Sequence, residues 1–99
     1  MQEIKKLVHY IDDEIDGVEE YLDLAEEFKT SHPDVSNIIY SIGMEELNHV
    51  QKLHDGVVLL INKQKTPAPE YMMKMWEYLH MKYVNKLRHL KWAYAEFKK

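Results

Sequence analysis

The sequence contains no cysteine, which excludes disulfide bonds, thiolate metal sites, iron–sulfur clusters and thiol nucleophiles. Any metal ion must therefore bind through oxygen or nitrogen atoms. Glycine and proline are scarce, with three of each among 99 residues, too few for a β-rich fold or a disordered segment. The length predicts a single domain, residues 1–99, with a small core that a partner chain would help to stabilise.

Long apolar runs are also missing. The longest, residues 56–61, is far shorter than the roughly 20 residues that a membrane-spanning helix needs. No signal peptide precedes the first predicted helix. We therefore expect a cytoplasmic protein that does not enter a membrane.

Positive charge is scarce in the first half of the chain. Residues 1–50 carry 13 acidic residues and 3 lysines, whereas residues 51–99 carry 10 basic and 4 acidic residues, so the net charge of −4 hides two opposite halves. The basic C-terminal segment could face the acidic half or a partner. Nucleic-acid binding is not expected, because no recognition motif accompanies the basic residues and the whole chain is acidic.

Apolar residues recur in alternating steps of three and four, which predicts three long α-helices. The first stripe comprises Ile4, Val8, Ile11, Ile15, Val18, Leu22 and Ala25, with Leu7 beside it. The second is Ile39, Ile42, Glu46, His49, Leu53, Gly56 and Leu60. The third is Met73, Trp76, His80, Tyr83, Leu87, Leu90, Tyr94 and Phe97.

Breaks at residues 30–34 and 65–69 separate helices predicted over about 3–29, 33–63 and 67–98. Both connections are short, so neighbouring helices should be antiparallel, giving an all-α, up-down-up fold. Gly43 and Gly56 would let another backbone approach the second helix closely, although each weakens that helix by about 1 kcal/mol.

Charged and ionisable side chains interrupt the inward faces at a few positions. Glu14 follows Leu7 by seven residues and precedes Tyr21 by seven, so it lies on the inner edge of the first helix. Glu46 and His49 lie within the second stripe, three residues apart, where both side chains can reach one ion. An unpaired buried carboxylate costs several kcal/mol, so these three residues require a partner or a metal.

The helical rise places these three residues at one height. At 1.5 Å per residue, Glu14 lies about 22 Å before the end of the first helix. Glu46 and His49 lie about 20 Å and about 24 Å after the start of the second. An antiparallel hairpin should therefore bring two carboxylates and one imidazole into a single layer of the core.

Such oxygen-and-imidazole sites suit iron, manganese or zinc, and a redox metal best explains the ligand set. One chain supplies only two carboxylates, whereas a two-metal site in a four-helix bundle typically uses four carboxylates and two histidines. A twofold dimer of two such hairpins would supply Glu14, Glu46 and His49 twice.

These motifs resemble the ferritin-like superfamily, in which a helix carrying Glu with Tyr seven residues later precedes a helix carrying Glu-x-x-His. The closest likeness is to the encapsulated ferritins, and it is carried by residues 13–21 and 45–49 within a matching stretch of about 5–62. The resemblance implies a four-helix bundle formed by two hairpins, with iron(II) oxidised at a di-iron site between the subunits. It also implies that Tyr21 is a nearby redox or supporting residue.

Two features depart from that family. The third helix is longer than the usual tail, and the chain ends in residues 95–99 without the apolar peptide that targets cargo to a protein shell. These departures weigh against the encapsulation and ring assembly that the resemblance implies, whereas a homodimer or a higher homo-oligomer is expected.

Two alternatives remain open at the level of sequence. Glu14, Glu46 and His49 could form a metal-free polar layer that sets the pairing of a helical dimerisation or adaptor module. His80, which interrupts the third stripe at a similar height, could join their layer as a ligand or as a neighbour of the ligands. The remaining histidines, His9, His32, His54 and His89, are expected to be surface residues.

Overall fold

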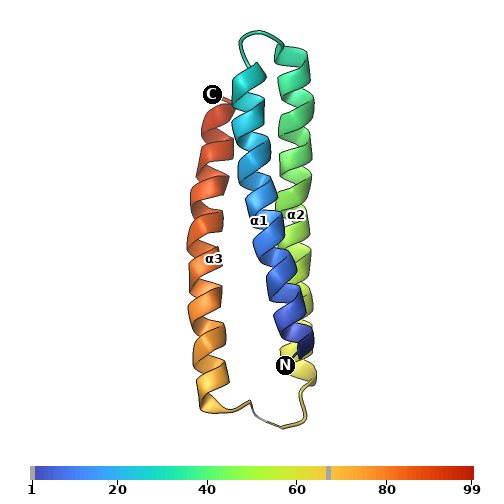
Figure 1. Cartoon of the computed structure of the whole chain (residues 1–99), viewed down its shortest axis with the longest axis vertical. Helices are drawn as coiled ribbons and strands as arrows, with labels where there is room; N and C mark the ends of the chain where they lie inside the picture. The colour runs from blue at the N-terminus through green and yellow to red at the C-terminus, as the bar shows by residue number, and fades with distance from the viewer. Residues whose placement is uncertain (1, 67) are drawn as a thin grey trace.

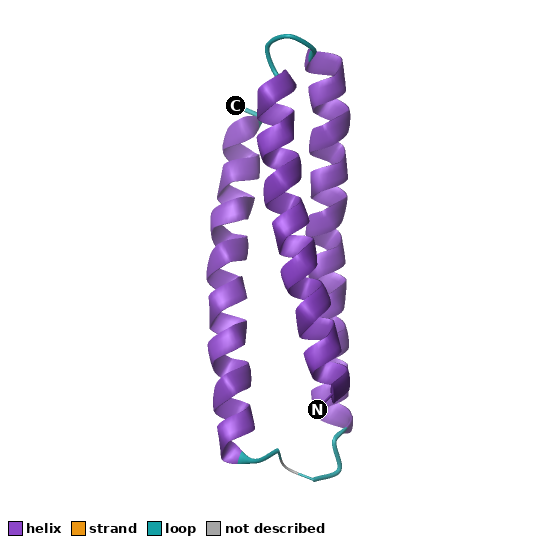
Figure 2. Ribbon diagram, in the orientation of Figure 1, coloured by secondary structure: helices purple, strands orange, loops and turns teal. Residues whose placement is uncertain are grey.

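The computed structural model describes residues 2–66 and 68–99, which form three long helices (Figures 1 and 2). They are α1 (Gln2–Phe28), α2 (Pro33–Lys63) and α3 (Glu70–Phe97). α1 and α2 form an antiparallel hairpin, and α3 turns back to run beside α1 in the same direction. The result is a rod of 55 × 18 × 16 Å. The predicted all-α, up-down-up arrangement is confirmed.

The core lies mainly between α1 and α2. On α1, the buried residues are those of the predicted stripe: Ile4, Val8, Ile11, Ile15, Val18, Leu22 and Ala25. Leu7 lies beside this row and is half-buried. These apolar side chains recur with the 3.6-residue period of an α-helix, and this pattern determines which face of α1 packs inward.

The inward face of α2 differs from the prediction. The residues buried most deeply recur every seven positions: Ser36, Gly43, Val50 and Val57. The predicted stripe lies beside this row, with most of its members half-buried and His49 exposed. This row carries smaller side chains than the predicted stripe, whose larger residues lie at the edges of the contact. The Ser36 hydroxyl adds a buried hydrogen bond to the carbonyl oxygen of Ala25, at 2.6 Å.

Aromatic residues hold the C-terminal half of α3 against the hairpin. The Tyr94 hydroxyl donates a hydrogen bond to the carbonyl oxygen of Val18. Its ring lies over Gly43, where an added Cβ would be only 2.7 Å from Tyr94 Cζ. Phe97 stacks on Tyr40, with ring centroids 5.0 Å apart. The glycine that was expected to admit a backbone therefore admits a tyrosine side chain.

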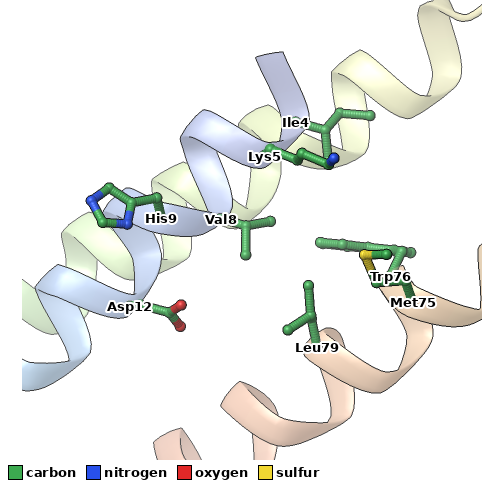
Figure 3. A pocket seen from close by; sticks show the side chains of 8 residues that line it. All are labelled: Ile4, Lys5, Val8, His9, Asp12, Met75, Trp76 and Leu79. Atoms are coloured by element: carbon green, nitrogen blue, oxygen red, sulfur yellow. The ribbon is translucent and has the colours of Figure 1, made fainter. Parts of the chain in front are cut away.

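The N-terminal half of α3 stands apart from α1 (Figure 1). A cleft of about 290 Å³ lies between the two helices here, with Ile4 and Val8 on one side and Trp76 and Leu79 on the other (Figure 3). Asp12 stands at one end of it. The predicted third stripe is thus buried at four of its last five positions, Tyr83, Leu90, Tyr94 and Phe97, with Leu87 half-buried. Before Tyr83, Trp76 and His80 are half-buried and Met73 is exposed.

Helix α3 begins at Glu70, three residues after the predicted start at position 67, which lies outside the described residues. Pro69 occupies the N-cap with φ −55° and ψ 147°. A residue that precedes proline is disfavoured in the α conformation, which favours a helix start after Ala68. The second proline of the connection therefore sets the helix start.

The opposite charges of the two halves meet at Lys86. Its Nζ atom lies 3.5 Å from both Asp16 Oδ1 and Glu19 Oε2, linking α3 to α1. All three side chains are exposed, so each pair contributes at most about 1 kcal/mol. Within residues 2–66 and 68–99, no helix combines the length and the apolar character needed to cross a membrane.

Candidate metal centre

Glu14 of α1 and Glu46 and His49 of α2 come together near the middle of the hairpin. One ligand atom from each residue lies within 4.8 Å of the others. His49 Nδ1 is 3.4 Å from Glu46 Oε1 and 3.6 Å from Glu14 Oε2. The structure thus brings the three predicted ligands together, as helical rise and a short connection indicated.

The three side chains do not lie in the core of the single chain. Their exposed fractions are 28% for Glu14, 21% for Glu46 and 50% for His49. Five residues correspond to about 140° around a helix, so Glu14 is turned well away from Glu19, and His49 well away from His54. Because Glu19 and His54 contact α3, the cluster lies on the opposite side of the hairpin.

We call this side, turned away from α3, the open face. It is formed by Leu7, Glu14, Tyr21 and Phe28 of α1 and by Val35, Ile42, Glu46, His49 and Leu53 of α2. Apart from the cluster and Tyr21, these residues are apolar, and all of them are half-buried or exposed. The prediction of a polar layer inside a core is therefore wrong for one chain, since α3 covers only the other side of the hairpin.

Gly17 is a feature of this site that the sequence analysis missed. An added Cβ at this position would lie 3.5 Å from Glu46 Oε2, so the glycine leaves space beside the carboxylate. The signal was available, because Gly17 follows Glu14 by three residues and must share its helix face. A glycine in the middle of a 27-residue helix is otherwise unfavourable.

The donor atoms fit a divalent cation of intermediate hardness. Two carboxylates and one imidazole are ligands that iron, manganese and zinc accept. Ligand atoms about 2.1 Å from one ion are separated from each other by roughly 3 to 4 Å. The distances of 3.4 and 3.6 Å from His49 to the two carboxylates lie in that range. Half of the coordination sphere would remain for water, substrate or a second chain.

His80 does not join this cluster. Its Nε2 atom lies 3.2 Å from Nε2 of His54, on the side of α2 that faces α3. The prediction that His54 is a surface residue is therefore wrong: it is half-buried between the two helices. A signal existed in the sequence, because His54 belongs to a row of mostly apolar residues spaced by seven: Tyr40, Leu47, His54 and Ile61.

Tyr21 lies on the same edge of α1 as Glu14, two turns further along, and is half-buried. Seven residues correspond to about 10 Å along the axis, so its backbone is not adjacent to the cluster. Its predicted redox or supporting role stays a prediction.

Comparison of the chain with protein-family models, with curated proteins and with solved structures finds no match. The proposal about function therefore rests on the residues of the cluster.

Proposed function

We propose that this protein is a ferritin-like iron-binding protein that oxidises iron(II) at a di-iron site formed between two subunits. What supports this is the meeting of Glu14, Glu46 and His49 on an otherwise apolar, uncovered face. Iron is the substrate in this proposal, and dioxygen or peroxide is the electron acceptor. Manganese or zinc could occupy the same ligands.

The position of the cluster along the hairpin favours a symmetric partner. Glu14 lies one residue from the midpoint of α1, and Glu46 and His49 flank the midpoint of α2. A twofold axis through the middle of the open face, perpendicular to the rod, would therefore overlap two hairpins along their full length and place their clusters opposite each other. The two chains would together supply four carboxylates and two imidazoles.

The apolar surroundings of the cluster support the same assembly. Half-exposed residues such as Leu24 and Val35 lie on or beside the open face, and a second copy would bury them. Burial would also raise the strength of carboxylate–metal interactions by removing water from the site. The protein's own residues would then hold two ions, orient them and limit solvent access.

Anaerobic titration of the purified protein with iron(II), combined with measurement of the solution mass, tests the proposal. We expect stoichiometric binding by the wild type and a mass corresponding to a dimer. Glu46→Ala should abolish stoichiometric binding, whereas Glu45→Ala, which removes the exposed neighbouring carboxylate, should not. No binding by the wild type, or equal binding by Glu46→Ala, would contradict the proposal.

A second function is favoured by one observation. His49 Nδ1 lies 3.4 Å from Glu46 Oε1 and 3.6 Å from Glu14 Oε2, so an N–H at this atom can interact with both carboxylates, and the cluster then needs no metal. The protein would then be a helical dimerisation or adaptor module in which this polar group sets the pairing. In that case Glu46→Leu with His49→Leu would keep or raise thermal stability, and elemental analysis would find no bound metal.

A further inference from the structure

His54 of α2 and His80 of α3 meet on the side of the hairpin opposite the open face. Their Nε2 atoms are 3.2 Å apart, and their ring centroids are 5.3 Å apart. The two residues are 26 positions apart and belong to helices whose backbones do not approach closely here. Two ligand nitrogens therefore converge on one point from separate elements.

Aromatic side chains fix the orientation of these imidazoles. The Tyr83 ring meets His80 edge-on at a centroid distance of 5.2 Å and His54 at 6.0 Å. Trp76 lies on a further side of His80, at 5.4 Å. Both histidines are half-buried, so their rings have little freedom to turn away from each other. Pre-oriented imidazoles lose little entropy on binding an ion.

The hydrogen bonds of the pair leave one nitrogen unsatisfied. Between two neutral imidazoles, one Nε2–H donates and the other Nε2 accepts, so a single proton lies between them. His54 Nδ1 is buried and has no hydrogen-bond partner. The nearby carboxylate oxygen Asp55 Oδ1 lies 3.6 Å from it. A proton on Nδ1 would face this carboxylate and leave the His54 Nε2 lone pair free, as in many metal-binding histidines.

We propose that His54 and His80 form a second metal site, distinct from the Glu14 cluster, which binds a divalent cation of the zinc type between α2 and α3. Two nitrogens at 2.0–2.1 Å from a tetrahedral zinc ion are about 3.3 Å apart. The observed separation of 3.2 Å is close to this value. When the cation binds, the proton between the two Nε2 atoms moves to Nδ1 of His80, so that both imidazoles stay neutral and bind through Nε2. Water completes the coordination of the ion.

One further feature supports this site. Glu77 precedes His80 by three residues on α3, the same spacing as Glu46 and His49, and its exposed side chain can turn toward the site.

The site is independent of the proposed iron chemistry. Glu14, Glu46 and His49 lie on the open face, and no residue is shared between the two groups. The variant of the whole 99-residue chain with Glu14→Gln and His49→Gln removes ligands from the first cluster and leaves His54 and His80 in place. Zinc binding to this variant therefore reports on the second site.

The decisive measurement is zinc titration followed by nitrogen-15 nuclear magnetic resonance of the imidazole rings. In the variant background, we expect the Nε2 signals of both His54 and His80 to shift together, with a rise in melting temperature of about 5 °C or more at saturating zinc. His80→Gln should lower the zinc affinity at least about tenfold, whereas His89→Gln, an exposed histidine on the same helix, should not.

The proposal fails if zinc leaves both Nε2 signals unchanged, or if His80→Gln and His89→Gln bind zinc equally. The nuclear magnetic resonance measurement on the wild-type protein resolves individual histidines, so it decides the matter even if a variant does not fold. Iron(II) binding at Glu14, Glu46 and His49 is unaffected by a negative result here, and the two proposals can fail separately.

Discussion

His49 Nδ1 lies 3.6 Å from Glu14 Oε2, although the two residues belong to different helices. This contact joins the helices at mid-height, and the position of one ligand therefore depends on how the hairpin packs. Helical rise and the short connection between α1 and α2 predicted the pairing, because the two residues lie at similar distances from that connection.

Glu14→Gln should weaken iron(II) binding by at least about tenfold and shift the protein toward monomers when iron is present. The variant keeps the size of the side chain but removes the charge that the ion requires. Calorimetric titration and solution mass together measure both effects. Asp13→Asn removes an exposed neighbouring charge and serves as the control; equal losses in the two variants would mean that only the general charge of α1 matters.

Gly17→Ala should raise the stability of the protein but lower its affinity for the metal. The added methyl group would lie 3.5 Å from Glu46 Oε2, in van der Waals contact that restricts the carboxylate, so we expect affinity to fall about tenfold. The helix itself should gain about 0.5–1 kcal/mol from losing a glycine. Thermal unfolding measures the change in stability, and metal titration measures the change in affinity. Unchanged affinity would show that the space beside Glu46 has no role in the site.

Replacement of Gly43 by alanine should lower stability, because the added methyl group must displace Tyr94. In Gly43→Ala the new Cβ would be 2.7 Å from Cζ of a ring that is only 2% exposed. We expect the free energy of unfolding to fall by about 1–3 kcal/mol, despite the better helix propensity of alanine. Gly56→Ala is the matched control, because its Cβ meets only Leu7 Cδ1 at 3.4 Å. Equal stability of the two variants in chemical denaturation would contradict this explanation.

The stripe of α1 was predictable because every inward position is an apolar residue. The Glu14, Glu46 and His49 group followed from the rise of two helices joined by a short turn. The central row of α2 was not, because Ser36 and Gly43 are too small or too polar to register as core residues. Their small size matters only when another element fills the space beside them, as Tyr94 does at Gly43.

The side of the hairpin on which α3 packs could not be predicted from the sequence either. Both edges of the hairpin carry apolar residues, and only the tertiary structure shows that Tyr40 and His54 are covered while Ile42 and His49 are not. The side on which α3 packs determines which histidines come into contact. It separates His80 from the Glu14 cluster and pairs it with His54.

Stability should fall as the pH is lowered below 6.5, in part because of His80. Its pKa is lowered in the folded protein by burial and by His54, so the unfolded chain binds more protons in this range. The contribution is fully present above pH 6.5 and is lost as the pH falls through the lower, folded-state pKa. Denaturation measured at several pH values should show a smaller acid-side loss for His80→Gln than for the wild type and for His89→Gln. Parallel curves for all three proteins would refute it.

Two buried tyrosines should make stability fall at high pH. Burial raises the pKa of Tyr83 to about 12, and burial together with Tyr40 and Asp23 raises that of Tyr94 to about 12, whereas the ordinary value is 10.0. The folded protein thus keeps protons that the unfolded chain releases, so this contribution is complete below pH 10 and disappears as the pH approaches 12. Ultraviolet absorbance of tyrosinate should show these two hydroxyls ionising only as the helices unfold. Tyr83→Phe should move alkaline unfolding to higher pH, whereas Tyr71→Phe, at an exposed position, should leave it in place. Ionisation of Tyr83 well before the loss of helical circular dichroism would contradict this account, because it would mean that the N-terminal half of α3 already opens in the folded state.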